Sequence, residues 1–263
     1  MNENPLGKNS LFPRTYNKDI LFFIPRKKSD ILNIDGYDLW NCYEFSYLDS
    51  CGKPVNKLLR LIYSALSPNI VESKSLKLYL SSFSMTVFDN IPIEIIRNDL
   101  QNGLQSDVKI VVFDCFDPFS YTNIEKNKFI DDINVDIDQY SLDSNLLQVI
   151  KSDREDIDEV YSNLLKTNCP ITGQPDWATL YISYKSKNRI DKISLIKYIV
   201  SFRNHNDYHE TCCERIFCDL YKILEPTWLI VNTYFTRRGG IEINPHRFYG
   251  IEPNYNDFHF WRQ

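Results

Sequence analysis

Hydrophobic and polar positions in the first half of the chain predict strands with one helix among them. Apolar and polar residues alternate over residues 39–49, which predicts a strand that ends in a turn at residues 50–52. Residues 57–67 suit either a second strand of the hairpin or a short helix, because their periodicity does not decide. Residues 90–104 place isoleucine and leucine on one helical face, and residues 107–117 predict a buried strand.

The second half repeats this plan. Residues 176–189 alternate like a strand, and residues 191–224 have helical periodicity with a break near residues 206–207. Residues 228–250 predict two strands joined by a turn at residues 239–240. The order of elements therefore indicates an internal duplication.

The spacing of two tryptophans supports this duplication. Trp40 and Trp177 each precede a Ser-Tyr pair by six and seven residues. Residues 131–159 are acidic, which is typical of a solvated linker. We therefore predict an α+β protein with an N-terminal module over residues 1–158 and a C-terminal module over residues 159–263.

Composition narrows the functional classes. The 263 residues are 43% hydrophobic and 25% charged, as in soluble globular proteins, and the formal net charge of −5 gives no general attraction for nucleic acid. No apolar run is long enough to predict a membrane span. Seven cysteines without a C-x-x-C pair, and a start without an apolar signal segment, predict free thiols in a reducing cytoplasm. Neither a G-x-G nor a P-loop pattern occurs, so a nucleotide would have to bind by other means.

One cysteine lies in a setting that suits a nucleophile. Cys169 is in a polar loop, and Asp176 follows it a short loop later. A thiolate attacks carbon well, and a nearby carboxylic acid can protonate what it attacks; the pair works best if Asp176 is itself protonated. The structural alternatives are an inert, packed cysteine and an aspartate that only caps a turn beside Pro175.

A His/Cys cluster follows at residues 205–213. His205, His209 and Cys213 are spaced four apart, so that on one unbroken helix they would face one way and could bind zinc. Core packing is the better interpretation of Cys212 and Cys213, because apolar residues continue their periodicity.

Three further groups have both a functional and a structural interpretation. Glu210 could accept hydrogen bonds from a purine-like edge at a helix start, or it could belong to a capping box with Asp207. Charged and hydroxyl residues at 72–77 suit an exposed strand face. The arginine turn at residues 236–240 suits either phosphate binding or a solvated hairpin tip.

Four motifs together resemble a known family. They are "VESKSLKLYLSSF", "NCPITGQPDW", "VSFRNHNDYHETCCERIF" and "YFTRRGGIEINP", in that order. In order and spacing they resemble the NADPH-dependent 7-cyano-7-deazaguanine reductases, the nitrile reductases called QueF, in their two-module form. The resemblance covers about residues 35–250.

The resemblance implies a fold and an activity. The fold is two tandem tunnelling-fold (T-fold) modules, antiparallel sheets backed by helices. The activity is reduction of the nitrile of 7-cyano-7-deazaguanine to the primary amine with NADPH, through a cysteine thioimide, in queuosine biosynthesis for tRNA modification. The resemblance also implies a cytoplasmic homodimer that takes a small deazapurine, requires no metal, and binds neither nucleic acid nor membrane.

The resemblance also assigns roles to residues. The catalytic residues are Cys169 as nucleophile and Asp176 as proton donor. The expected substrate-binding residues are Ile70, Val71, Glu72, His209 and Glu210. The expected cofactor-binding residues are Ser73, Lys74, Arg237, Arg238 and Gly239.

Two other classes of function compete with this interpretation. A zinc-dependent T-fold hydrolase of purines or pterins would use Cys169, His205 and His209, and would lose its activity to chelators. A non-catalytic purine-binding module would bind ligand without oxidising NADPH. The presence of both Cys169 and Asp176 argues against the second class.

Overall fold

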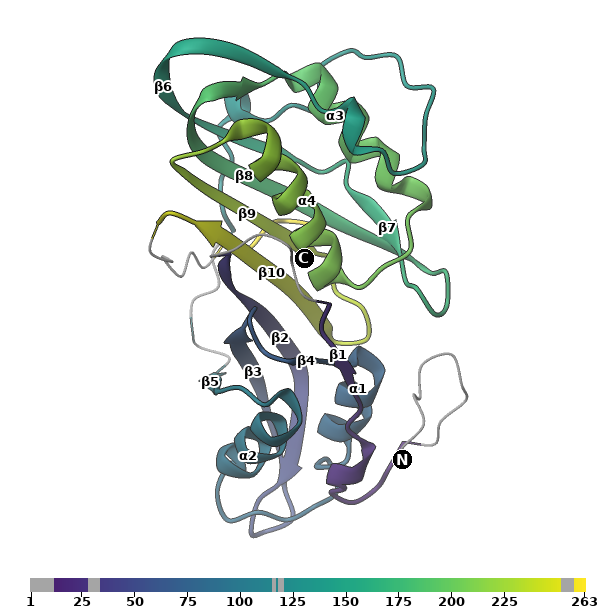
Figure 1. Ribbon diagram of the computed structural model, residues 1–263. Helices are drawn as coiled ribbons and strands as arrows, with labels where there is room; N and C mark the ends of the chain where they lie inside the picture. The colour runs from purple at the N-terminus through teal and green to yellow at the C-terminus, as the bar shows by residue number, and fades with distance from the viewer. Residues whose placement is uncertain (1–11, 28–33, 115–116, 118–120, 252–257) are drawn as a thin grey trace. The chain divides into compact units, whose positions relative to one another are not determined.

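The structure, a computed structural model, divides into two compact units (Figure 1). It describes residues 12–27, 34–114, 117, 121–251 and 258–263. Unit 1 comprises residues 1–28, 37–118 and 237–243, and unit 2 comprises residues 29–36, 119–236 and 244–263. The module boundary predicted at residues 158 and 159 stays a prediction.

A three-stranded antiparallel sheet forms the centre of unit 1, in the order β5–β3–β2. Strands β2 (Asp35–Leu48) and β3 (Pro54–Ser64) form the predicted hairpin, so the undecided residues 57–67 begin in a strand. Its turn places Gly52 at a φ of +77°, a conformation that glycine adopts without steric cost. The third strand is β5 (Val108–Phe113), as predicted.

The start of unit 1 adds a small second sheet. Strands β1 (Phe23–Pro25) and β4 (Asn69–Val71) pair with each other, and a 3₁₀ turn, η1 (Lys18–Ile20), precedes them. Both η1 and β1 lie within residues 12–27, the described part of the N-terminal segment.

Helices α1 (Ser73–Ser81) and α2 (Ile93–Leu104) complete unit 1. The strand interpretation of residues 72–77 is therefore wrong. The carboxylate of Glu72 caps α1, because its two oxygens accept hydrogen bonds from the backbone N–H groups of Lys74 and Ser75, each at 2.8 Å. The core of unit 1 lies between these helices and the sheet and includes Trp40, Phe45, Leu59, Leu76, Phe83, Ile96 and Leu100.

Unit 2 is built around four antiparallel strands in the order β10–β9–β8–β6. They are β6 (Val149–Ser162), β8 (Pro175–Ile190), β9 (Trp228–Phe235) and β10 (Ile241–Tyr249), and short β7 (Lys166–Asn168) pairs with the start of β8. The predicted β8, β9 and β10 are confirmed. The linker interpretation of the acidic stretch is wrong from residue 149 onward, because β6 pairs with β8 there.

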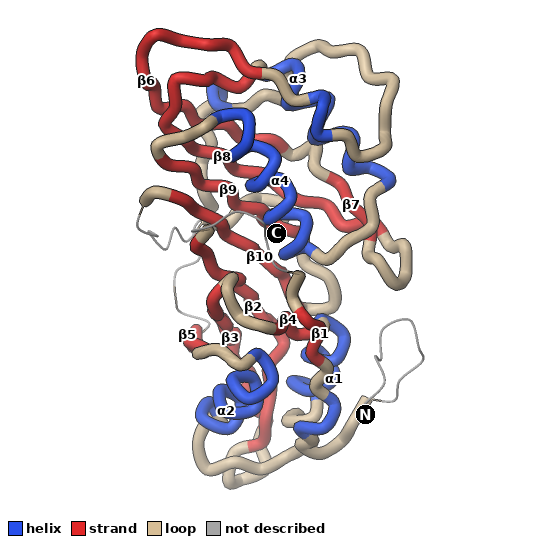
Figure 2. The backbone as a smooth tube through the Cα atoms, in the orientation of Figure 1, coloured by secondary structure: helices blue, strands red, loops and turns tan. Residues whose placement is uncertain are grey.

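Two helices cover this sheet, as the blue segments of Figure 2 show. They are α3 (Lys192–Ser201) and α4 (His209–Leu224), and the 3₁₀ turn η4 (Phe202–Asn204) lies at the predicted break. Two further 3₁₀ turns, η2 (Lys126–Lys128) and η3 (Ser144–Leu146), precede the sheet. The core of unit 2 includes Leu180, Ile182, Leu195, Ile199, Phe217, Leu220, Val231 and Phe235.

The helix pair of each unit contains the same pattern of hydrogen bonds. In each, a carboxylate caps the first helix, a serine donates to the carbonyl of the cap residue, a tyrosine hydroxyl donates to an aspartate of the second helix, and a later serine donates to the tyrosine carbonyl. The first four positions have equal spacing, and they are Glu72, Ser75, Tyr79 and Ser82 in unit 1 and Asp191, Ser194, Tyr198 and Ser201 in unit 2. The aspartates are Asp99 and Asp219, which follow the tyrosines by 20 and 21 residues.

This repeat replaces the one based on tryptophan. Trp40 lies on β2, the first strand of its hairpin, whereas Trp177 lies on β8, which leads directly into the helices. The two tryptophans therefore do not correspond. The segments "ESKSLKLYLSS" and "DKISLIKYIVS" do correspond, and they share serine, leucine and tyrosine at the same offsets.

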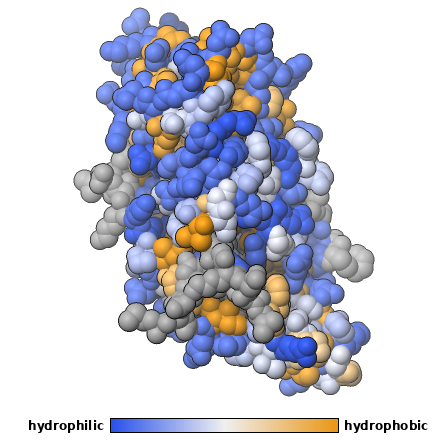
Figure 3. Space-filling model, turned by 90° about the vertical axis from the view of Figure 1, so that its right-hand side faces the viewer, coloured by the Kyte–Doolittle hydropathy of each residue, from blue (hydrophilic) through white to orange (hydrophobic). Residues whose placement is uncertain are grey.

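The predicted α+β class is confirmed: the protein consists of antiparallel sheets backed by helices. The face of the molecule shown in Figure 3 is mostly hydrophilic, with scattered hydrophobic side chains. Among the described residues, no helix is both long enough and apolar enough to cross a membrane.

We predict that the tyrosine–aspartate bonds stabilise each helix pair. Tyr198→Phe removes the donor that lies 2.8 Å from the buried Asp219. The free energy of unfolding should fall by about 1–3 kcal/mol, because a buried carboxylate loses a hydrogen bond. Urea unfolding measures the change. Tyr140→Phe, at a half-exposed position, is the matched control and should change it by less than about 0.5 kcal/mol.

Alkaline pH should weaken the fold through the same groups. Burial, followed by the neighbouring aspartate, raises the pKa of Tyr198, and burial and Asp99 likewise raise the pKa of Tyr79. The folded state then keeps protons that the unfolded state loses above pH about 10, so stability is complete below that pH and is lost as the pH rises. Each such tyrosine should lower the free energy of unfolding by about 1.4 kcal/mol per pH unit there. Unfolding measured from pH 9 to 12 should show a shallower slope for Tyr198→Phe; an equal slope would contradict the prediction.

Candidate active site

The β7–β8 hairpin holds Cys169 and Asp176 at the two ends of its loop. Thr167 pairs with Asp176, and the backbone N–H of Cys169 donates to the carbonyl of Gln174 at 2.9 Å. The loop closes with Gly173 at a φ of +67°. Both side chains are largely enclosed, since Cys169 is 8% exposed and Asp176 is 3% exposed.

His209 joins Asp176 to the start of helix α4. Its Nε2 lies 3.3 Å from Oδ2 of Asp176, and its ring stacks on Phe235 at a centroid separation of 3.8 Å. The structure thus brings a predicted substrate-binding residue into contact with the predicted proton donor. The stacking fixes the plane of the imidazole, so that the histidine can in turn fix the orientation of the carboxyl group.

Glu210 follows in the first turn of α4 and is 3% exposed. The capping-box explanation for this residue is wrong, because the N-cap residue is Tyr208 and the carboxylate of Asp207 accepts from the N–H of Tyr208. The positive end of the helix dipole favours a carboxylate at this place. Glu210 is therefore a buried acceptor beside His209.

The cysteines and histidines of the cluster have separate environments. His205 precedes α4, where its Nε2 lies 3.7 Å from the Asp207 carboxylate, so it does not share a helical face with His209. The thiol of Cys213 lies within hydrogen-bonding distance of two backbone carbonyls, those of Val231 and Pro245. Burial, followed by the carboxylate of Asp207, raises the pKa of the Cys212 thiol well above its usual range. Both cysteines are fully buried, which confirms their packing role. Within the described part of the chain, no three His, Cys, Asp or Glu side chains form a group that could hold a metal ion.

Asn168 ties the cysteine loop to the segment before α4. Its side-chain nitrogen donates to the carbonyls of Arg203 and His205, and its backbone N–H donates to the same His205 carbonyl at 2.9 Å. Its own carbonyl accepts from the N–H of Asp207 at 3.1 Å. Lys166 adds a bond to the Arg203 carbonyl at 2.7 Å. The residue before Cys169 thereby fixes the distance between the cysteine and the start of α4.

The remaining predicted residues lie in unit 1. Ile70 and Val71 end strand β4 and are buried, with Val71 in the core. Glu72 is 1% exposed and caps α1 through both oxygens. Ser73 and Lys74 form the first turn of this helix, and the Ser73 hydroxyl lies 3.4 Å from Glu72. A substrate-binding role for Ile70, Val71 and Glu72 stays a prediction, and so does a cofactor-binding role for Ser73 and Lys74.

The arginine turn is held by Tyr43. Its backbone N–H donates to the carbonyl of Gly240 at 2.8 Å, and its ring lies 3.6 Å below the guanidinium of Arg237. The backbones of Arg238 and Ile241 bond to each other in both directions. The exposed Arg237 thus stabilises the turn by a cation–π contact, while Arg238 follows in the turn.

The sequence analysis assigned no functional role to two charged residues near this turn. Lys77 lies against Gly239, and Glu44 lies against Gly240; both line a pocket with the two glycines. Lys77 could have been found only by recognising α1 as a helix, which places it one turn beyond Lys74.

Two family models match the chain. One, described as "Nitrile reductase, 7-cyano-7-deazaguanine-reductase N-term", matches residues 12–112, and the other, "QueF-like protein", matches residues 175–253. The cysteine hairpin enters the second match at its β8 strand. The class of protein is therefore that of the QueF-type reductases.

Curated relatives narrow this class. A protein of Desulfotalea psychrophila is 43% identical, over 92% of this chain and 91% of the relative. Others from Paraburkholderia xenovorans, at 39% over 97% and 94%, and Dechloromonas aromatica, at 41% over 94% and 90%, are similar. All three are named NADPH-dependent 7-cyano-7-deazaguanine reductase. The chain belongs to the family of NADPH-dependent 7-cyano-7-deazaguanine reductases.

Proposed function

We propose that this protein reduces the nitrile of 7-cyano-7-deazaguanine to the primary amine, 7-aminomethyl-7-deazaguanine, with NADPH, in the biosynthesis of queuosine. Membership of the reductase family, with more than nine-tenths of the chain matched by a relative of that name, supports the reaction. The observation that carries the proposal in the structure is the enclosed hairpin with Cys169 and Asp176 at its ends and His209 against the aspartate.

The chain's own residues supply the covalent chemistry. The Cys169 sulfur, as thiolate, forms a bond to the nitrile carbon while the nitrile nitrogen takes a proton from Asp176, which gives a thioimide. Reduction at that carbon gives a tetrahedral amine, and breaking of the C–S bond returns the thiolate and leaves an imine. A second reduction and a proton complete the primary amine. A buried carboxylate close to Cys169 would oppose thiolate formation, so Asp176 has to hold its proton when the thiolate forms.

Substrate orientation is assigned to the start of α4 and to Glu72. Buried carboxylates accept well from the N–H groups of a purine-like edge. Glu210 and Glu72 are both enclosed, at 3% and 1% exposure. We assign them, with His209 and the backbone of Ile70 and Val71, to the deazapurine.

The cofactor residues fit a dinucleotide. NADPH, when bound, supplies the hydride for both reductions. Gly239 has a φ of +55°, and a Cβ there would approach Lys77 to 3.3 Å, so this position suits close approach of a ligand to the backbone. Arg238 offers a guanidinium for phosphate, and we assign Ser73, Lys74, Arg237, Arg238 and Gly239 to the cofactor.

Two measurements test this function. Intact-mass analysis of the protein mixed with 7-cyano-7-deazaguanine alone should show the covalent adduct. Loss of NADPH absorbance should then show two NADPH consumed for each amine formed. Binding of the deazapurine without NADPH oxidation would overturn the proposal in favour of a non-catalytic module. Activity abolished by chelators, with stoichiometric zinc in the protein, would favour the hydrolase.

Asn168 should act as a positioning residue. Asn168→Ala removes the side-chain bonds to the Arg203 and His205 carbonyls and so loosens the cysteine loop, which its backbone bonds still hold. The kcat should therefore fall about 10- to 100-fold through misplacement of the nucleophile, with little change in the KM for NADPH. Steady-state kinetics measure both constants. Asn188→Ala is a matched control, because Asn188 also donates to two backbone carbonyls in unit 2, those of Ile223 and Leu224. Equal losses of kcat in both variants would contradict a positioning role.

We also propose a cytoplasmic homodimer that acts on the free base and binds no nucleic acid. Family resemblance supports the dimer, and the net charge of −5 argues against general nucleic-acid binding. Light scattering should give twice the mass of the chain. A monomer at micromolar concentration with full activity would contradict the dimer.

A further inference from the structure

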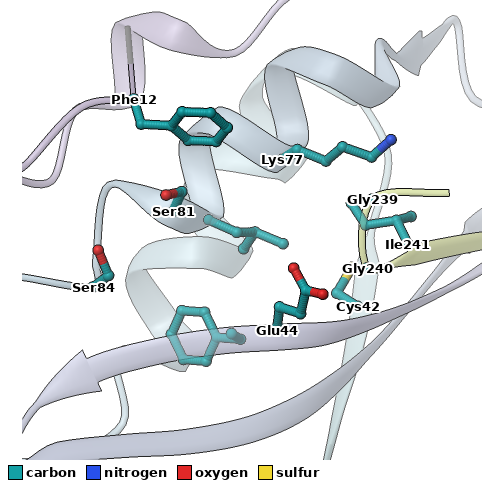
Figure 4. Close-up of a pocket in the computed structure, with 11 residues that line it drawn as sticks. Phe12, Cys42, Glu44, Lys77, Ser81, Ser84, Gly239, Gly240 and Ile241 are labelled. Atoms are coloured by element: carbon teal, nitrogen blue, oxygen red, sulfur yellow. The ribbon is translucent and has the colours of Figure 1, made fainter.

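A pocket of about 260 Å³ lies within unit 1, and its lining includes neither Cys169 nor Asp176. Strand β2, helix α1 and the arginine turn each contribute to its lining (Figure 4). The charged side chains are Glu44 and Lys77. Apolar side chains and two serine hydroxyls form the rest, together with the thiol of Cys42: Phe12, Phe45, Leu80, Ile241, Ser81 and Ser84.

Two irregular features of the backbone create this pocket. The pairing of β2 with β3 shifts register between Cys42 and Phe45, and such a bulge re-aims the side chains around it. Both flanking residues therefore line the pocket together with Glu44, although strict alternation would turn Phe45 to the other face. In Figure 4 the Glu44 carboxylate points into the pocket from β2.

The arginine turn supplies the second feature. Gly240 has a φ of +74°, and a Cβ there would lie 2.6 Å from the Glu44 carboxyl carbon, so the glycine leaves the space that the carboxylate occupies. Lys77 runs along the edge of the pocket against Gly239, with its Nζ 3.3 Å from the position of a Cβ (Figure 4). The turn therefore places a carboxylate, which accepts hydrogen bonds, and an ammonium group on one small apolar pocket.

This combination matches a nucleobase with a phosphate attached nearby. Apolar walls suit a flat ring, and a carboxylate accepts from an exocyclic amino group. An ammonium group at the edge pairs with phosphate. The volume lies below the roughly 300–1,000 Å³ of pockets that hold whole drug-sized ligands, so the pocket takes one end of a dinucleotide.

We propose that this pocket binds the adenosine end of NADPH, with Glu44 accepting from the adenine amino group and Lys77 pairing with a cofactor phosphate. The inference rests on the proposed function, because the lining includes Gly239 of the assigned cofactor turn.

Competition by 2′,5′-ADP, which carries only the adenosine end, tests the proposal. It should inhibit competitively against NADPH. Lys77→Met should raise both the Ki of 2′,5′-ADP and the KM for NADPH roughly tenfold or more, with kcat nearly unchanged. Glu44→Ala should raise both constants about three- to tenfold, and Glu44→Gln should restore most of the loss, because its amide oxygen still accepts.

The KM for NADH, which lacks the 2′-phosphate, identifies the cofactor phosphate that pairs with Lys77. An unchanged KM for NADH in Lys77→Met assigns Lys77 to the 2′-phosphate, and a parallel rise assigns it to the pyrophosphate; both support the proposal. The matched controls are Lys53→Met and Glu94→Gln, at exposed positions of unit 1 outside the pocket, and both should leave every constant unchanged.

Two results would overturn the proposal. They are non-competitive inhibition by 2′,5′-ADP, and wild-type constants in both Lys77→Met and Glu44→Ala. Failure of the proposed function is separable, because the Cys169 adduct forms without NADPH. If wild type and variants all form the adduct and the variants keep the wild-type KM for NADPH and Ki for 2′,5′-ADP, only the pocket assignment is wrong. If wild type forms no adduct and oxidises no NADPH, the proposed function itself is wrong.

Discussion

Cys169→Ala is expected to abolish the covalent adduct with 7-cyano-7-deazaguanine and to lower turnover on the order of 10⁴-fold or more, because the nitrile carbon loses its nucleophile. Intact-mass analysis detects the adduct, and NADPH oxidation measures turnover. The deazapurine should still bind, with a Kd within about threefold of wild type, because the groups that bind its edge are unchanged.

Cys51→Ala is the control for this experiment. Cys51 is a free, exposed cysteine in the β2–β3 turn, so its removal should leave adduct and turnover intact. An adduct retained by Cys169→Ala would show that another nucleophile acts. An adduct lost equally from both variants would point to general damage, which the unfolding curve of each variant would reveal.

Asp176→Asn is expected to slow adduct formation about 10²- to 10⁴-fold, because the amide has the size of the carboxyl group but cannot supply its proton. Quenched-flow mixing followed by intact-mass analysis gives this rate directly, separate from hydride transfer. Asn keeps a polar partner for Nε2 of His209, so the hairpin and the start of α4 should keep their contact. Cys169 itself is untouched.

The exposed Asp153 on β6 provides the matched control, and Asp153→Asn should form the adduct at the wild-type rate. Adduct formation at the wild-type rate in Asp176→Asn would instead assign the proton to another donor. Rates of adduct formation across pH should separate the two cases, since Asp176→Asn removes the titration of the donor from the profile.

Most elements followed from periodicity, and the two errors have physical causes. Leucines at every second position made α1 resemble a strand, but the cap by Glu72 and the contacts of Leu76 and Leu80 with the core favour a helix. Strand β6 looked like a linker because it is acidic. It lies at the edge of the sheet order in unit 2, where charged side chains remain solvated and discourage pairing with other chains.

The site was predictable only where its parts are close in the sequence. A short loop was enough to relate Cys169 to Asp176. The contact between Asp176 and His209 depends on how α4 packs beside β8, and no local pattern encodes it. The pocket beside Gly239 depends on a bulge in β2, which no hydrophobic or polar pattern of that segment indicates.

The cap of α1 has a thermodynamic consequence for recognition. Glu72 has already surrendered its rotamer freedom during folding, because Lys74 and Ser75 hold one carboxylate oxygen each. A carboxylate has about four lone-pair positions, and the Ser73 hydroxyl uses a third, so roughly one remains for a guest molecule. Association at Glu72 would then forfeit little further entropy, which favours a tight complex from few contacts. Asp191 caps the first helix of the other pair in a similar way, through the backbone N–H of Ser194.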